Sequence, residues 1–156
     1  MTCIAYFDGF MAADKQTSFG CLPVRTTKLK RHGPWIVGGC GDAARVREIH
    51  EWVAGGMKPG ELPDFQRDPE ECVSVMLASA DGLFVLQNSH ALIRIEQPFM
   101  AIGSGCDFAI AAMHLGCSAE AAVAIACTYD VGCGLGIDVL ELTPVKVSKK
   151  RLRAGV

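Results

Sequence analysis

Apolar and polar positions in the N-terminal part of the chain alternate in short runs that are typical of β-strands. Residues 3–7 and 10–13 flank Asp8-Gly9, a dipeptide that favours a tight hairpin turn. Residues 28–39 repeat this arrangement around a central His-Gly-Pro turn. Residues 15–27 have a mixed pattern that predicts a short strand with loops. The region therefore predicts two antiparallel hairpins.

A helical period follows these strands. Residues 42–53 place their apolar side chains on one side, and Asp42 is a favourable N-cap. Residues 68–79 open with Asp-Pro-Glu-Glu, an order that suits a helix N-terminus, and predict a second helix. A further helix is predicted over 105–115, and Ser118 predicts the cap of the next one.

The remaining apolar runs predict strands. Residues 83–86 and 91–95 form a third hairpin pattern, residues 100–102 a further strand, and residues 137–142 alternate as a final strand. Strands thus come in hairpins and helices in pairs, which disfavours a parallel sheet. We predict an α+β fold in which two antiparallel sheets pack face to face between helix pairs, a four-layer α/β/β/α sandwich.

Composition restricts the function classes. The chain has 156 residues, half of them hydrophobic and 21% charged, with a net charge of −2, which indicates one globular domain and gives no sign of nucleic-acid or membrane binding. A basic run from Lys146 to Arg153 indicates a solvated tail, so we place the domain at 2–147 and the tail at 148–156. The start shows no signal peptide, and we expect a cytoplasmic protein.

Cysteines and histidines do not predict a cofactor. The eight cysteines are scattered without a C-x-x-C pair, so we expect neither zinc nor a disulfide framework, and no metal or organic cofactor at all. The histidines at positions 50, 90 and 114 are interpreted as structural.

Candidate chemistry begins at position 2. Removal of Met1 would leave Thr2 with a hydroxyl nucleophile and a free α-amine on one residue. An α-amine has an unperturbed pKa of about 7.7–8.0, so it can act as a general base near neutral pH. Threonine with an N-terminal amine is an activated nucleophile of this kind.

Several motifs follow Thr2 in a fixed order. They are Thr2-Cys-Ile, Ala13-Asp14, Lys28, Gly41, Ile102-Gly-Ser-Gly105 and Asp130-Val-Gly-Cys-Gly-Leu-Gly-Ile-Asp138. Together they span nearly the whole chain and resemble the threonine peptidases of the proteasome β-subunit type, with HslV-type peptidases similar in size. The resemblance implies an N-terminal-nucleophile hydrolase fold and a threonine-type endopeptidase.

The same resemblance implies roles for individual residues. Lys28 would lie beside the Thr2 hydroxyl, Asp14 would pair with Lys28, and the Gly41 N–H at a helix N-terminus would bind the oxyanion. Ser104 and Asp130 would surround the N-terminal amine. The implied assembly is a self-compartmentalising homo-oligomer of stacked rings that degrades unfolded polypeptide, with a possible ATP-dependent unfoldase as partner.

Other interpretations stay open. Asp14 and Lys28 could form a surface ion pair, the glycines near 41 could serve only a turn, and Ser104 could cap the helix over 105–115. Functionally, the alternatives are an N-terminal-nucleophile amidohydrolase that acts on a small amide and a catalytically silent, proteasome-like shell or interaction protein.

Three features depart from the family pattern. Cys133 stands where the family usually has serine, and a thiol is a weaker hydrogen-bond donor. Cys3 is a rival nucleophile only if cleavage occurs after Thr2. Processing would fall to a methionine aminopeptidase, and a chain that keeps Met1 has no free amine on Thr2.

Overall fold

The computed structural model describes residues 1–61, 72–88 and 91–142. Its strands pair into two larger sheets and one small hairpin, and every pairing is antiparallel in the described ranges. The predicted boundary at 147 and the basic tail lie outside the described residues.

The first sheet contains the N-terminal hairpin at its centre. Its strand order is β10-β1-β2-β11. The turn between β1 and β2 has positive φ angles at Asp8 and Gly9, as the Asp-Gly signal predicts. The bounds are Ile4–Phe7 for β1, Phe10–Asp14 for β2, Phe99–Ile102 for β10 and Ile137–Glu141 for β11.

The second sheet has the order β5-β6-β7-β8-β9. It contains the predicted hairpins around Gly33-Pro34 and over residues 83–95. The strands are β5 (Leu29–His32), β6 (Trp35–Gly41), β7 (Val73–Ser79), β8 (Gly82–Gln87) and β9 (Ile93–Ile95). The mixed stretch between the sheets forms two strands rather than one, β3 (Gln16–Phe19) and β4 (Leu22–Arg25), which pair with each other.

The helix predicted over residues 68–79 is wrong for its C-terminal part. Val73–Ser79 is the central strand β7, and residues 68–71 lie outside the described ranges. Six of its seven residues are buried because neighbours cover both faces of this strand. A strand buried on both faces loses its period of two, and a continuous apolar run cannot be told from a buried helix by pattern alone.

Three α-helices flank the sheets in the described part of the chain. Helix α1 (Ala43–Ala54) begins at Asp42, whose side chain accepts the Arg45 N–H, as predicted. Helix α2 covers Cys106–His114, and α3 covers Ala119–Tyr129 with Ser118 as its N-cap. A short 3-10 helix, η1, spans Pro59–Glu61.

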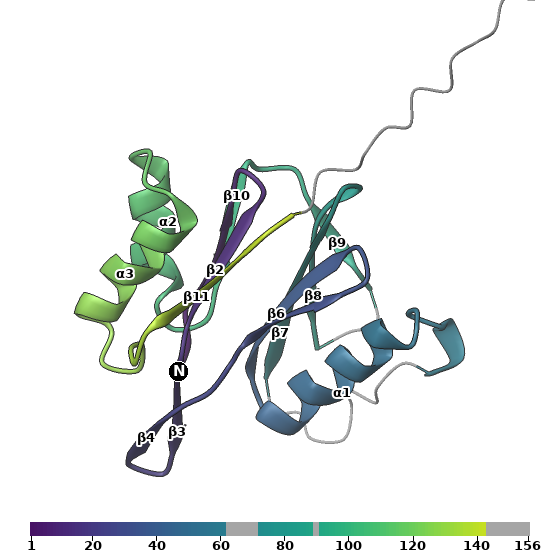
Figure 1. Ribbon diagram of the computed structural model, residues 1–156, viewed down its shortest axis with the longest axis horizontal. Helices are drawn as coiled ribbons and strands as arrows, with labels where there is room; N and C mark the ends of the chain where they lie inside the picture. Colours follow the sequence, from purple (N-terminus) through teal and green to yellow (C-terminus); the bar gives the residue numbers. More distant parts are fainter. Residues whose placement is uncertain (62–71, 89–90, 143–156) are drawn as a thin grey trace, which may run out of the picture.

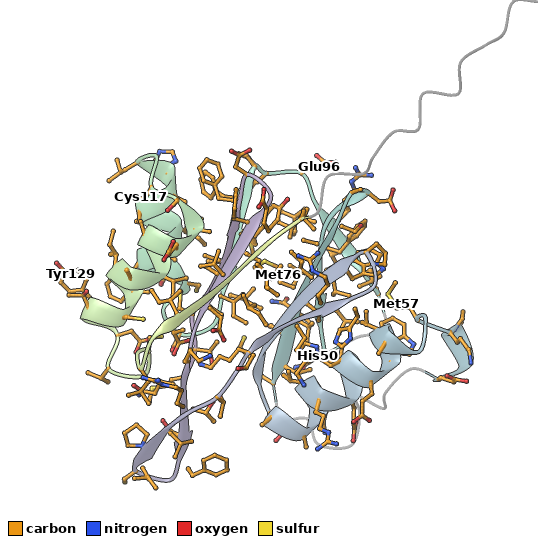
Figure 2. All side chains as sticks on the ribbon, viewed as in Figure 1. His50, Met57, Met76, Glu96, Cys117 and Tyr129 are labelled. Atoms are coloured by element: carbon orange, nitrogen blue, oxygen red, sulfur yellow. The ribbon has the colours of Figure 1, made fainter. Side chains whose placement is uncertain are left out.

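Figure 1 shows α2 and α3 on the outer side of the first sheet and α1 on the outer side of the second, with the sheets between them. Three apolar clusters fill the interfaces. One lies under α2 and α3, one between the sheets, and one under α1. Met76, labelled in Figure 2, belongs to the cluster between the sheets. The described fold is therefore mixed α+β, with one α-helix over the second sheet where a pair was predicted. No helix in the described ranges is long and apolar enough to cross a membrane.

Candidate active site

The N-terminus of the chain is fixed at the start of β1, against the segment that joins β10 to α2. The Gly105 N–H donates to the Thr2 carbonyl oxygen at 3.2 Å. Gly103 has a φ of +94°, and a Cβ at this position would lie 2.1 Å from that same oxygen. Only glycine lets the two backbones approach this closely. The Gly-Ser-Gly motif thus holds Thr2, whose own exposure is 6%.

A buried ion pair lies beside the Thr2 hydroxyl. The Lys28 Nζ donates to Thr2 Oγ1 at 2.8 Å and to Asp14 Oδ1 at the same distance. The Lys28 side chain is 6% exposed and that of Asp14 is fully buried. The alternative of a surface ion pair is therefore wrong. A buried cation in direct contact with a hydroxyl oxygen stabilises the negative charge that this oxygen gains on losing its proton.

Asp14 is held by four donors. Its Oδ1 accepts the Lys28 ammonium and the Cys3 N–H at 2.9 Å. Its Oδ2 accepts the N–H groups of Gln16 at 3.0 Å and Gly134 at 3.1 Å. Both carboxylate oxygens are thus satisfied in a site without water contact, as a buried charge requires. Asp14 thus holds the Lys28 ammonium in place while this ammonium also contacts the Thr2 hydroxyl.

A second group of polar side chains surrounds the Thr2 nitrogen. The Thr2 N–H donates to Ser104 Oγ at 3.1 Å. Helix α2 has Gly105 as its N-cap with no side-chain capping bond, so Ser104 faces Thr2 and does not cap the helix. Asp130 ends α3 and accepts the Gly132 N–H at 2.8 Å and the Cys133 thiol at 3.2 Å.

The pKa values in this group are set by burial and by Asp130. Burial acts to raise the pKa of the Asp130 carboxyl, but hydrogen bonds from Ser104, Gly132 and Cys133 outweigh it and lower this pKa below its usual range. Burial and the bond to Asp130 raise the pKa of the Cys133 thiol to about 12. Cys133 therefore keeps its proton at neutral pH and donates a hydrogen bond to Asp130.

The rival nucleophile Cys3 has a different environment. Its side chain is fully buried in the cluster under α2 and α3. Burial, and the neighbouring Cys133 and Asp14, strongly raise the pKa of its thiol. A buried, protonated thiol is inert as a nucleophile.

Gly41 lies at the junction of β6 and α1. Its φ is +104°, and a Cβ here would lie 1.9 Å from the Cys72 carbonyl oxygen. Glycine is thus required by the backbone, but at the end of strand β6 and not in a turn, so the turn interpretation is wrong for this position. The position also borders the same cavity as Thr2. A helix N-terminus at this point offers free N–H groups and positive potential toward the cavity.

A cavity of about 420 Å³ opens beside Thr2 and Lys28. Gly39 and Gly41 of β6 lie along it, and α1 contributes Ala43 and Val46. The cavity is large enough for a side chain of a peptide bound across Thr2. Of the six predicted site residues, Thr2, Lys28 and Gly41 border the cavity and Asp14 contacts Lys28. Ser104 contacts the Thr2 nitrogen, and Asp130 is hydrogen-bonded to Ser104.

Sequence reasoning missed one ion pair that supports the site. The Lys15 Nζ contacts both carboxylate oxygens of Asp138, at 2.6 and 2.7 Å, and the Thr27 hydroxyl at 3.3 Å. Lys15 follows Asp14, and Thr27 precedes Lys28. The pair therefore connects the segments next to Asp14 and Lys28 to strand β11, which contains Asp138. The only sequence signal for this pair was that Lys15 follows Asp14 and that Asp138 ends the last motif.

It also missed a histidine pair under α1. His50 lies on α1 (Figure 2), borders the cavity, and is 6% exposed. Its Nδ1 lies 3.0 Å from His32 Nε2. Burial, with His32 and Lys30 nearby, lowers the pKa of His50 to about 4. Among the described residues no group of three or more His, Cys, Asp or Glu side chains is arranged to hold a metal ion.

Comparison with known proteins gives a fold. No protein-family model and no curated protein matches the sequence. Among solved structures, the chain is similar to BPH of Thiobacillus denitrificans in complex with epoxomicin, at 21% identity and a TM-score of 0.67, covering 92% of this chain and 99% of that one. The eukaryotic HslV of Trypanosoma brucei gives 23% identity and a TM-score of 0.66, covering 90% of this chain and 98% of that one. A second structure of BPH of Thiobacillus denitrificans gives 23% identity and a TM-score of 0.61, covering 92% of this chain and 98% of that one. The chain therefore has an HslV-like fold.

Proposed function

We propose that this chain is a threonine-type endopeptidase of the proteasome-like kind, with Thr2 as its nucleophile once Met1 has been removed. The observation that carries the proposal is the position of Lys28 Nζ, 2.8 Å from both Thr2 Oγ1 and Asp14 Oδ1 in a buried site beside a cavity. The sandwich would then be the four-layer arrangement of N-terminal-nucleophile hydrolases, with residues 2–147 as its single domain.

Removal of Met1 changes the chemistry of the Thr2 nitrogen. While Met1 is attached this nitrogen belongs to an amide, which donates to Ser104 and has no basic lone pair. After removal it is an α-amine, and Ser104 and Asp130 hold it in place. The amine then takes the proton of Oγ1, while the Lys28 charge, oriented by Asp14, stabilises the oxygen that remains.

Acyl transfer follows in two steps. Thr2 Oγ1 bonds to the carbonyl carbon of the substrate, and the Gly41 N–H binds the resulting oxyanion. The carbon–nitrogen bond then breaks, and the protonated amine of Thr2 gives its proton to the leaving nitrogen. Water attacks the ester, transfers a proton through the same amine, and releases the acid and the free Thr2 hydroxyl. No metal or redox partner takes part in these steps.

The proposal includes an assembly. The resemblance to the proteasome β-subunit type and the HslV-like fold support stacked homo-oligomeric rings that enclose the sites and admit unfolded polypeptide, with an ATP-dependent unfoldase as the feeding partner. A large ring seen by native mass spectrometry separates this peptidase from an amidohydrolase that acts on a small amide.

The decisive experiment is intact mass spectrometry of the untagged protein before and after treatment with epoxomicin. We expect loss of Met1 and one adduct on Thr2, which Thr2→Ala abolishes and Thr2→Ser retains. Thr128→Ala, on the exposed surface of α3, is the matched control and should label like the unaltered chain. A chain without Met1 that forms no adduct would contradict the proposal and favour the silent shell.

A further inference from the structure

The cavity beside Thr2 continues along one face of β5 and one face of α1. Successive side chains of a strand point to opposite faces, so Lys28, Lys30 and His32 share a face. The cavity borders Lys28 and Lys30 but not Leu29, which belongs to the core between the sheets. Opposite them, the cavity wall on α1 includes Val46 and His50, one helical turn apart. Lys30 and His50 thus both border the cavity, one from the strand and one from the helix.

The charged groups along this cavity are mostly neutralised. Lys28 is paired with Asp14. Arg47 on the rim is paired with Glu51 at 2.9 Å, and both are largely exposed. The single acidic group on the wall, Asp42, accepts the Arg45 N–H at 2.8 Å at the start of α1. The helix N-terminus stabilises the negative charge of Asp42 there.

Lys30 differs from these groups. It borders the cavity and forms no ion pair within residues 1–61, 72–88 and 91–142. The backbone of Lys30 lies two residues beyond Lys28 on β5, which corresponds to about 6.7 Å along the strand. The long side chain of a bound substrate residue spans such a distance. Because the two other cations on the cavity wall, Lys28 and Arg47, are already paired, an anionic group of a bound substrate would interact with Lys30.

His50 adds a polar group without adding charge. With its pKa lowered to about 4, its imidazole is neutral at neutral pH. Its Nδ1 faces His32, so its orientation is fixed by the 3.0 Å contact. The wall therefore presents a positioned neutral ring next to the Lys30 ammonium rather than a second cation.

We propose that this cavity binds the substrate residue whose carbonyl is attacked, and that Lys30 selects an acidic side chain there, with glutamate preferred over aspartate because of the distance. The inference rests on the proposed peptidase function. Glutamine has the same shape as glutamate and lacks only the charge, so the ratio of kcat/KM for two peptides that differ in this residue measures the contribution of Lys30.

The test uses the processed protein and four fluorogenic peptides that differ only at the residue before the cleaved bond: glutamate, glutamine, leucine and lysine. We expect kcat/KM for glutamate to exceed that for glutamine by about five- to tenfold, and this ratio to fall as salt is raised. Lys30→Met should bring the ratio close to one, mainly by lowering kcat/KM for the glutamate peptide. Lys30→Glu should make lysine the preferred residue over glutamate.

Lys58→Met is the matched control. It removes one lysine charge from an exposed position on η1, paired with Glu61 and away from the cavity, and should leave all four rates unchanged. A glutamate-to-glutamine ratio near one in the unaltered protein, or an equal ratio in Lys30→Met, overturns the inference. Adduct formation on Thr2 by epoxomicin is followed in each variant. If Thr2 forms an adduct but the protein does not prefer the glutamate peptide, only the inference fails. If no adduct forms at all, the peptidase proposal fails as well.

Discussion

The two helix-covered faces of the molecule are packed with different side chains. Under α2 and α3 the buried residues are nearly all alanine and cysteine, such as Ala5, Ala12 and Ala126. Under α1 they are large: Ile49, Trp52 and several valines and leucines. Small side chains let backbones approach closely, whereas larger ones hold a helix away from its sheet.

The two parts of the candidate site differ in the same way. On the α2 and α3 side, backbone segments meet at contact distance, and N–H groups of Gly105 and Gly134 reach Thr2 and Asp14. On the α1 side, the helix and β5 leave a cavity between them. The first face therefore holds the groups that need fixed positions, and the second leaves room for a ligand.

The largest loss of stability and labelling should come from removing the charge of Asp14, on the α2 and α3 side of the site. Asp14→Asn leaves Lys28 buried without a carboxylate, and we expect a loss of about 3–5 kcal/mol in the free energy of unfolding. Labelling of Thr2 by epoxomicin should slow at least about a hundredfold. Urea unfolding and the labelling rate measure the two effects.

Two variants sharpen this prediction. Asp14→Asn combined with Lys28→Met should regain much of the stability but none of the labelling, because no charge is left buried. Asp138→Asn breaks a pair whose side chains are 19% and 30% exposed, and should cost about 1 kcal/mol or less. Equal losses for Asp14→Asn and Asp138→Asn would contradict the structure.

The next prediction concerns His50, on the cavity side, and the pH dependence of stability. His50 has its pKa lowered to about 4 in the folded chain, against about 6.5 when unfolded. Between these values the unfolded chain binds a proton that the folded chain does not, so stability is present above pH 6.5 and falls as the pH drops toward 4. The expected loss from this group is at most about 3 kcal/mol.

His50→Gln should remove this part of the acid sensitivity. We expect the free energy of unfolding of the variant, measured by urea titration at pH 4.5, 5.5 and 7, to depend less on pH than that of the unaltered chain. His114, whose ring contacts Phe99 at the edge of α2, provides the control through His114→Gln. If both variants keep the same acid dependence as the unaltered chain, His50 is not the group responsible.

Local signals in the sequence predicted most of the fold near the candidate site. Asp8-Gly9 and the Asp42 and Ser118 caps each act through neighbouring residues, so their effects are visible in sequence order. The β7 strand was missed because its burial on both faces depends on α1 on one side and the first sheet on the other. Pairing in a sheet is not local, and propensity gives way to it.

The candidate site shows the same limit. The contacts of Thr2 with Lys28 and Ser104 were expected from the order of the motifs and their resemblance to the proteasome β-subunit type. Lys30 and His50 were not identified as a pair, since one lies on a strand and the other on a helix, and only packing places both at the cavity. The Lys15–Asp138 contact was missed for the same reason, with 123 positions between its members.

The smallest effects are expected from replacing one glycine on each side, Gly105 next to α2 and Gly39 next to α1. A Cβ on Gly105 would lie 2.9 Å from the Cβ of Cys3 and 3.0 Å from that of Ala126, atoms that move only with their backbones. A Cβ on Gly39 would meet the γ-methyl groups of the half-buried Val46, at 2.6 and 2.9 Å. These methyl groups stand beside the cavity and can shift toward it.

Neither glycine has a positive φ, so alanine tests space alone. Gly105→Ala should cost about 1–3 kcal/mol, the usual range for overpacking. It should also slow labelling of Thr2, because α2 must move together with its N-cap, and the N–H of this N-cap, Gly105, binds the Thr2 carbonyl. Gly39→Ala should cost about 1 kcal/mol or less and chiefly reduce cleavage of peptides with large side chains, because the cavity takes up the displaced methyl groups. Urea unfolding of both variants, with the labelling rate and the four-peptide series, measures this. A larger stability loss for Gly39→Ala than for Gly105→Ala would show that α1 is packed as tightly as α2 and α3. The large side chains under α1 would then not be the reason for the cavity.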